Sequence, residues 1–196
     1  MRIVALQASP NEGGLTASMA KQALSGAARA GAETELVHLC QLSLESCRAC
    51  DTGWGLCRQE GRCVIEDDLE AVRAKMAEAD AVVISTPVYF GDVAEVLKAF
   101  FDRLRRCQFA GPEDARLSGK YLLGIAAAGG GGGGGPTCLV SMERYYAHMG
   151  MRVFDELIAT RRSREYMLET AELAGTVPTA PEILPTEIFL FAILSL

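Results

Sequence analysis

Residues 81–103 join a short buried-strand pattern to a helical pattern through the loop 86–91. Residues 81–85 are mostly apolar and β-branched, which predicts a strand that is covered on both faces. From Asp92 onward the apolar residues recur every three or four positions, the period of a helix with one buried stripe. A strand that leads into a helix is the repeating unit of a parallel sheet, so this segment indicates an α/β fold.

The same alternation of strand and helix extends through most of the chain. Further strand patterns occur at residues 2–7, 33–39, 121–127 and 152–160. Helical patterns follow them at residues 15–30, 67–79, 136–149 and 163–174. This alternation predicts one doubly wound α/β domain, in which a five-stranded parallel sheet carries helices on both faces. We place the domain at residues 1–175 and a proline-containing C-terminal tail at residues 176–196.

The acidic net charge indicates which kind of partner the chain can bind. The net charge of -6 and the pI near 5.0 argue against nucleic acid or an anionic membrane, which attract clustered Lys and Arg. We therefore expect a small-molecule partner. The chain begins on a strand pattern without a signal peptide, so we expect a cytoplasmic protein. The apolar run 188–196 is too short to span a bilayer, and we expect it to pack on the sheet or, preferably, on a second subunit.

The loop 86–91 has a composition that suits a flat ring. Tyr89 and Phe90 offer aromatic faces, and Gly91 permits a tight turn or a close backbone approach. The alternative is a plain connection between strand and helix. Ligands of open parallel sheets lie beyond the carboxyl ends of the strands, and two further unusual loops are predicted at that edge.

The first of these loops, residues 9–16, leads into the first predicted helix. Its hydroxyls, small residues and backbone amides at a helix start favour a phosphate, although a simple helix cap would use the same residue types. It contains neither G-x-x-x-x-G-K-[ST] nor G-x-G-x-x-G, which argues against nucleotide hydrolysis and a Rossmann dehydrogenase.

The second loop is a run of seven glycines, 129–135, after the fourth predicted strand. Such a run is costly to order, and the alternative interpretation is a flexible linker that tightens when a ligand binds.

Four of the seven cysteines crowd into the long segment 40–66, with the spacing C-x2-C-x6-C-x5-C. Four thiolates in one loop are enough to ligate a [4Fe-4S] cluster or a tetrahedral zinc ion. Unligated thiols are the alternative. Cys40, Cys107 and Cys138 lie outside this spacing, and we expect them in the core because free cysteine is commonly buried.

Two segments and one loop carry a resemblance to a known family. The loop has Ser9, Pro10, Gly14 and Thr16, and the segments are GRCVIEDD at 61–68 and ADAVVISTPVYFGDVAEVLKAFFDR at 79–103. On these residues the chain resembles the flavodoxin-fold NAD(P)H-dependent FMN reductases, and among them the iron–sulfur flavoproteins. The resemblance extends over residues 1–174 and implies the strand order 2-1-3-4-5.

The resemblance also assigns site residues. Around the FMN phosphate it implies Ser9, Asn11, Gly14, Leu15 and Thr16. Along the isoalloxazine ring it implies Pro87, Val88, Tyr89, Phe90 and Gly91, with Gly129 and Gly130 in the third flavin loop. For the metal, the spacing of the cysteine segment gives Cys47, Cys50, Cys57 and Cys63 as candidate ligands.

The chain departs from the family pattern in three loops, and in one of them the glycine run 129–135 is longer than the family's usual pair. In the first loop Asn11 replaces the usual arginine, and Glu12 adds a negative charge. In the cysteine segment Gly53 stands at the third position of C-x2-C-x2-C, and Cys57 arrives four residues late. These departures weaken the expected charge on the phosphate side and leave assembly of the cluster open.

The function that the resemblance implies is electron transfer through bound FMN. Hydride from NAD(P)H reaches the flavin, and a flavin, a quinone or another small or protein acceptor takes the electrons. The scheme requires no protein acid or base, so we name no catalytic residue. We expect a homodimer or homotetramer. The alternatives are a non-enzymatic flavodoxin-like electron carrier and a zinc-stabilised interaction module.

Overall fold

A computed structural model describes residues 1–108, 110 and 116–179, and the apolar run 188–196 lies outside them. The five strands form one parallel sheet of order β2-β1-β3-β4-β5, as predicted. The strands are β1 (Arg2–Gln7), β2 (Glu33–His38), β3 (Ala81–Pro87), β4 (Tyr121–Ala128) and β5 (Arg152–Thr160). The helices are α1 (Leu15–Arg29), α2 (Leu56–Gln59), α3 (Leu69–Glu78), α4 (Glu95–Cys107), α5 (Gly135–His148) and α6 (Arg164–Thr176), with short 3-10 helices η1 (Leu39–Gln41) and η3 (Val177–Thr179).

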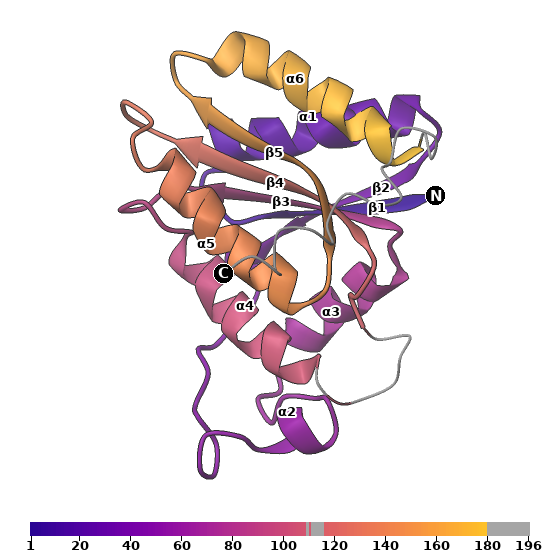
Figure 1. Ribbon diagram of the computed structural model, residues 1–196, viewed down its shortest axis with the longest axis vertical. Helices are drawn as coiled ribbons and strands as arrows, with labels where there is room; N and C mark the ends of the chain where they lie inside the picture. The colour runs from indigo at the N-terminus through magenta and orange to yellow at the C-terminus, as the bar shows by residue number, and fades with distance from the viewer. Residues whose placement is uncertain (109, 111–115, 180–196) are drawn as a thin grey trace, which may run out of the picture.

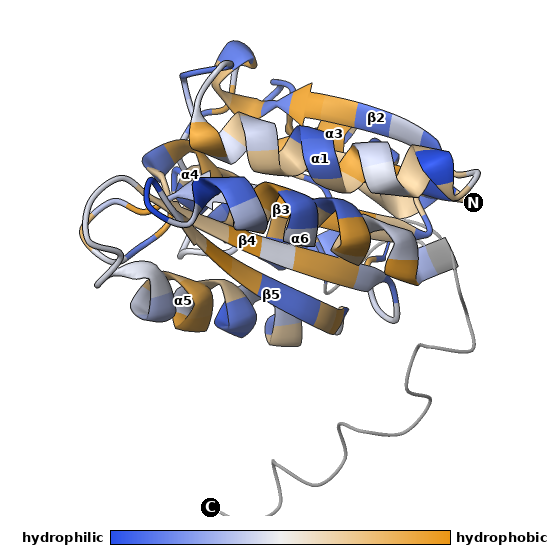
Figure 2. Cartoon of the chain, turned by 90° about the horizontal axis from the view of Figure 1, so that it is seen from above, coloured by the Kyte–Doolittle hydropathy of each residue, from blue (hydrophilic) through white to orange (hydrophobic). Residues whose placement is uncertain are grey.

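Helices cover both faces of the sheet, which confirms the doubly wound architecture (Figure 1). Val82 and Ile84 of β3 join the core under α3, α4 and α5, whereas Val83 joins the core under α1 and α6. All residues of β3 are buried, as expected for a strand covered on both sides. Figure 2 shows the mainly hydrophobic strands β3 and β4 beneath helices α1 and α6, which carry both hydrophilic and hydrophobic residues.

Helices α1 and α6 approach each other at the level of their backbones. A Cβ atom added to Gly26 of α1 would lie only 1.8 Å from the carbonyl oxygen of Glu172 in α6. A glycine is therefore required at this crossing. This close contact fixes the position of α6 along the axis of α1.

Helix α4 begins at Glu95, three residues later than the apolar periodicity indicates. The difference arises because β3 continues to Pro87 and the chain then makes a turn before the helix. The amide of Ala94, the residue just before α4, donates to Oγ1 of Thr86 at 3.0 Å. This bond fixes the start of α4 against the end of β3.

The cysteine-bearing segment contains more structure than expected, namely η1 and the single-turn helix α2. The prediction that Cys40 is buried is wrong. The η1 turn directs Leu39 into the core and leaves Cys40 exposed. Cys107 and Cys138 are buried, as predicted. A short 3-10 helix, η3, also occupies the start of the predicted tail.

No helix in the described part of the chain is both long enough and apolar enough to cross a bilayer.

Candidate functional site

The loops after β1, β3 and β4 start side by side at the carboxyl edge of the sheet, on the left of Figure 1. Ser85 of β3 pairs with Gln7 of β1 on one side and with Ile125 of β4 on the other. Backbone bonds continue beyond the strands, from the amide of Ala8 to the carbonyl of Ser85 at 2.9 Å and from Val88 to Ala127 at 3.0 Å. The sheet therefore brings together the three loops that the sequence singled out.

The first loop is folded by its own polar side chains. Oγ of Ser9 accepts a hydrogen bond from the amide of Asn11, and Oδ1 of Asn11 accepts one from the amide of Gly13, each at 3.1 Å. Helix α1 starts after Gly14 without a side-chain cap and without an acidic residue in its first turn. The structure thus contradicts the helix-cap alternative. The first-turn amides of α1 and its positive dipole end favour an anion.

The carboxylate of Glu12, which adds a negative charge to the first loop, is hydrogen-bonded to a neighbouring side chain. It accepts a hydrogen bond from the side-chain amide of Gln41, next to the end of β2. Nζ of Lys21 donates to the backbone carbonyl of Glu12 at 3.2 Å. These contacts partly offset the negative charge at the loop.

The second loop contains a tight turn that projects an aromatic ring outward. Tyr89 and Asp92 exchange backbone hydrogen bonds of 2.9 and 3.0 Å. The two residues between them, Phe90 and Gly91, have φ angles of 53° and 80°, which is the combination that a type I′ turn requires. This conformation is unfavourable for phenylalanine, and its side chain is fully exposed. A strained backbone that exposes a large ring indicates a binding role rather than a plain connection.

The third loop touches the second through glycines. A Cβ atom on Gly134 would lie 2.9 Å from Cα of Gly91 and 3.1 Å from Cγ1 of Val88. The glycine run is therefore packed at this end, and a uniformly flexible linker does not describe it. The sequence assigned Gly129 and Gly130 instead, but added Cβ atoms there would meet nothing within 4 Å. The sequence did not single out Gly134, because nothing distinguishes it from the other six glycines of the run.

The four clustered cysteines line one pocket. Cys47, Cys50, Cys57 and Cys63 share it with Cys107 from the end of α4, which the sequence placed only in the core. Across the described ranges, no three His, Cys, Asp or Glu side chains are arranged to hold a metal ion. The four-cysteine ligand set stays a prediction.

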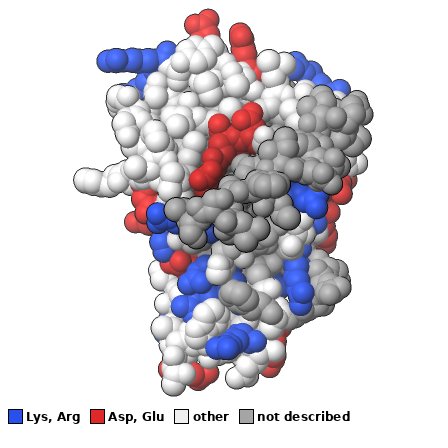
Figure 3. All heavy atoms as spheres, in the orientation of Figure 1, with Lys and Arg blue, Asp and Glu red and all other residues white. Residues whose placement is uncertain are grey.

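Arginines from α4 connect this pocket to the body of the protein. Arg103 is fully buried, and its Nε donates to Sγ of Cys63 at 3.4 Å. Arg106 stacks 4.5 Å from the ring centre of Trp54 and donates to the carbonyl of Gly53 at 2.5 Å. The residues that depart from the family spacing are therefore anchored on α4. Figure 3 shows several Lys and Arg side chains around this lower part of the molecule.

Burial keeps the pocket thiol of α4 protonated. It raises the pKa of Cys107 to about 12, with a smaller contribution from the charge of Glu70. Burial likewise raises the pKa of Cys138, which lies outside the pocket, to about 12. A thiol in such surroundings loses its proton only when a metal or another cation replaces it.

The two candidate sites lie at opposite ends of α4 (Figure 1). The aromatic loop precedes Glu95, and Cys107 is the last residue of this 13-residue helix. A helix of that length spans roughly 20 Å. Within one copy of the chain, the strand-end loops and the thiol pocket are thus separate sites.

Comparison with known proteins gives a family match. The family model for NADPH-dependent FMN reductases matches residues 1–163. An iron–sulfur flavoprotein of Methanocaldococcus jannaschii is 37% identical over 105 residues, which are 54% of this chain and 52% of the relative. An iron–sulfur flavoprotein of Methanosarcina thermophila is 37% identical over 113 residues, which are 56% of this chain and 57% of the relative. The chain spans about half the length of the curated relatives it matches.

Solved structures share the fold. An NAD(P)H:quinone oxidoreductase from Methanothermobacter marburgensis aligns with a TM-score of 0.67 at 20% identity, over 90% of this chain and 94% of that one. A flavone reductase aligns with a TM-score of 0.71 at 18% identity, over 91% of this chain and 62% of that one. At these identities the likeness concerns the fold alone.

Proposed function

The chain belongs to the NADPH-dependent FMN reductase family, and on that premise we propose that it binds FMN across its three strand-end loops and oxidises NAD(P)H. The electrons would pass to a flavin, a quinone or another small or protein acceptor. The observation that carries this proposal is the contact between Gly134 and Gly91, which joins the glycine run to the aromatic loop. The uncapped start of α1 follows the neighbouring strand β1 at the same edge of the sheet.

Each loop offers a different part of the cofactor a suitable surface. The first-turn amides of α1 and the hydroxyls of Ser9 and Thr16 suit the phosphate. The segment from Pro87 to Gly91 suits the ring, and Tyr89 is half exposed there. When bound, FMN supplies the hydride-accepting chemistry. The chain's task is then to orient the ring and limit the access of water.

We further propose that the thiol pocket holds a metal, with a [4Fe-4S] cluster preferred to zinc. Four cysteines line it together with Arg106, and Nε of Arg103 donates a hydrogen bond to Sγ of Cys63, which would favour a thiolate ligand there. The relatives named as iron–sulfur flavoproteins support the cluster rather than zinc. The assembly as a homodimer or homotetramer stays a prediction, which light scattering tests.

The test is the visible spectrum of protein purified without oxygen, with iron, zinc and sulfide assayed on the same sample. A flavin spectrum that NAD(P)H bleaches supports the reductase. Iron and sulfide in equal amounts support the cluster, and zinc alone supports a structural zinc site. If the protein binds flavin but NAD(P)H does not reduce it, the protein is an electron carrier and not a reductase.

A further inference from the structure

The loop that leads into α1 contains no cation of its own. Residues 8–14 include no Lys or Arg and carry one carboxylate, that of Glu12. A phosphate monoester brings about -1.5 to -2 charges at pH 7. The amides and the dipole of α1 offset only part of this charge. A positive charge from elsewhere in the chain would strengthen a phosphate site at this loop.

We infer that Arg164, the first residue of α6, supplies this positive charge to the FMN phosphate. The inference rests on the FMN binding proposed above. Nη2 of Arg164 donates to Oγ of Ser18 in the first turn of α1 at 3.1 Å. Oγ of Ser18 donates in turn to the carbonyl of Gly14, the residue that precedes α1, at 2.9 Å. One hydroxyl thus connects the guanidinium to the start of the helix.

The position of Arg164 is fixed from both sides. Before it, Thr160 and Ser163 form a closed turn, in which the amide of Thr160 donates to Oγ of Ser163 at 2.8 Å and the amide of Ser163 donates to Oγ1 of Thr160 at 3.1 Å. After it, the close approach of Gly26 and Glu172 holds α6 against α1. Arg29 adds an ion pair with Glu172 at 2.7 Å. The start of α6 therefore cannot move freely away from the start of α1.

Arg164 fits the task better than the other cation near the loop. Lys21 is the alternative, but its ammonium group donates to the carbonyl of Glu12 and so compensates that part of the loop. Arg164 presents a planar fork with five N–H donors, a geometry that matches two phosphate oxygens. Its bond to Ser18 leaves further donors for an anion at the first-turn amides of α1. The geometry therefore favours a guanidinium–phosphate contact at this helix start.

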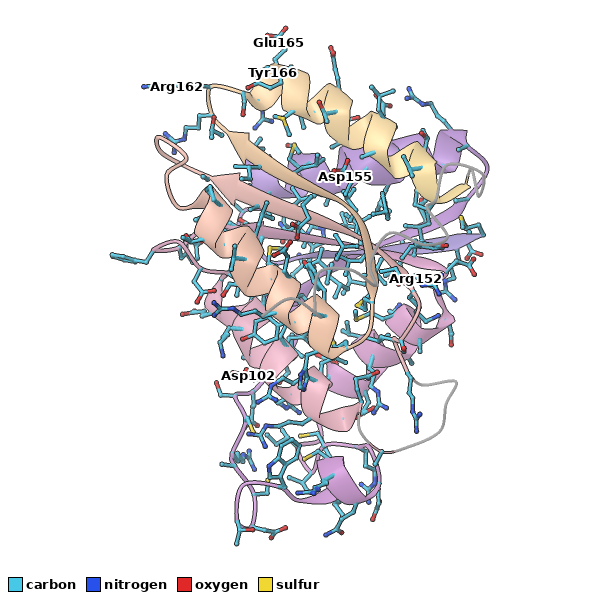
Figure 4. All side chains as sticks on the ribbon, in the orientation of Figure 1. Asp102, Arg152, Asp155, Arg162, Glu165 and Tyr166 are labelled. Carbon is cyan, nitrogen blue, oxygen red and sulfur yellow. The ribbon has the colours of Figure 1, made fainter. Side chains whose placement is uncertain are left out.

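Arg162 provides a matched control. It lies in the same turn between β5 and α6, and Figure 4 shows its side chain pointing away from the body of the protein. It shares the charge of Arg164 and is likewise exposed. A general effect of net charge on FMN binding would therefore appear equally in Arg162→Gln and Arg164→Gln.

The experiment compares FMN with riboflavin, which has the same ring and no phosphate. Dissociation constants are measured by flavin fluorescence for the wild-type protein, Arg164→Gln, Arg162→Gln and Lys21→Gln. We expect Arg164→Gln to weaken FMN binding about tenfold, which is roughly 1.4 kcal/mol, because it removes charge-assisted hydrogen bonds to the phosphate. Riboflavin binding should stay unchanged, and Arg162→Gln should bind both flavins as the wild type does. Ser18→Ala, which keeps the charge and removes the anchoring hydroxyl, should have a smaller effect limited to FMN.

Three outcomes would overturn the inference. Equal FMN affinity of Arg164→Gln and the wild type removes any role for this guanidinium. An equal loss of FMN and riboflavin affinity points to the ring site or the fold instead of the phosphate. A larger FMN-specific loss in Lys21→Gln assigns the phosphate to that lysine. In each of these cases the wild type still binds FMN and the proposed function stands, whereas a wild type that binds neither flavin refutes both proposals.

Discussion

Arg103 and Asp67 form a buried ion pair with two contacts, Nη1 to Oδ2 at 2.5 Å and Nη2 to Oδ1 at 2.9 Å. Their side chains are only 1% and 2% exposed. The same guanidinium donates to the backbone carbonyls of Glu45 and Ile65, on either side of the cysteines. The pair thus holds both ends of the cysteine segment on α4.

We predict that Asp67→Asn lowers the free energy of unfolding by about 3–5 kcal/mol, because it leaves the buried charge of Arg103 uncompensated. Urea unfolding at neutral pH measures this loss. Asp68→Asn is the matched control, since this neighbouring carboxylate makes an exposed bond to the amide of Ser43 and should change stability by less than about 1 kcal/mol. Equal losses in the two variants would contradict the special role of the ion pair.

The same pair predicts a pH dependence. Burial opposes ionisation of Asp67, but hydrogen bonds from Arg103 and from the amides of Glu45 and Leu69 outweigh it and lower the pKa of the carboxyl. The stabilisation is therefore complete above the unfolded pKa of about 3.9 and is lost as the pH falls through the lower folded value. The gap in stability between wild type and Asp67→Asn should narrow only below about pH 4.

The contact between the aromatic loop and the glycine run predicts a local effect on flavin binding. In Gly134→Ala the new Cβ would lie 2.9 Å from the backbone of Gly91, so the two loops must separate. We expect about a tenfold loss of FMN affinity with an unchanged circular dichroism spectrum. Gly133→Ala, whose Cβ would meet nothing within 4 Å, should bind FMN normally. The same affinity in both variants would show that this contact does not shape the site.

The thiol pocket predicts which cysteines matter for metal content. Cys57→Ser should lower the bound iron or zinc to less than about half of the wild-type amount, because Cys57 faces the pocket from α2. Cys138→Ala removes a thiol of α5 that is fully buried and lies outside the pocket, and it should keep the metal. Elemental analysis measures the iron and zinc bound per chain in both variants and in the wild type. Full metal content in Cys57→Ser would exclude this late cysteine as a ligand.

Glu156, a partly buried carboxyl on the edge strand β5, gives a prediction about stability: replacing it by a neutral side chain should stabilise the protein at high pH. Burial, followed by the nearby charge of Glu143, raises the pKa of Glu156 to about 7. Its Oε1 atom and the hydroxyl of Tyr146 are both buried without a hydrogen-bond partner in the described part of the chain. Because the folded pKa exceeds the unfolded value of about 4.3, stability falls as the pH rises between these values.

Glu156→Gln should therefore be more stable than the wild type above about pH 7, by about 1 kcal/mol after allowance for the partial exposure of the group. Near pH 4 the difference should vanish. Thermal unfolding at several pH values measures it. Glu165→Gln, an exposed carboxylate at the start of α6 (Figure 4), is the control and should show no such trend. A variant that is less stable at high pH would contradict the raised pKa.

The sequence predicted the sheet because local hydrophobic periods determine it. Residues 81–85 indicated a strand covered on both faces, and the structure has that strand. The order of the five strands was implied by the family resemblance and not by these periods, and it is confirmed. The turn at Phe90 and Gly91 was harder to foresee, since a phenylalanine with a positive φ angle contradicts its own preference. The backbone hydrogen bonds between Tyr89 and Asp92 hold that conformation, and the propensity of a single residue does not register them.

Contacts between distant residues explain the other differences. Arg103 falls on the buried stripe of α4 with Phe100, and a charge on such a stripe could have indicated an ion pair. Its partner, Asp67, begins the helical pattern at residues 67–79, where an acidic residue is favourable for another reason, its interaction with the helix dipole. No local pattern indicates that Arg164 reaches Ser18, because the crossing of α1 and α6 decides this contact. Patterns along the chain identify the loops, and only the packed fold shows which residues meet.

The most direct test of the account is the visible spectrum of the anaerobic protein after incubation with FMN and removal of free flavin, recorded before and after NADPH is added. We predict a retained flavin spectrum that NADPH bleaches. A protein that retains no flavin after this incubation would show that the three strand-end loops do not form an FMN site.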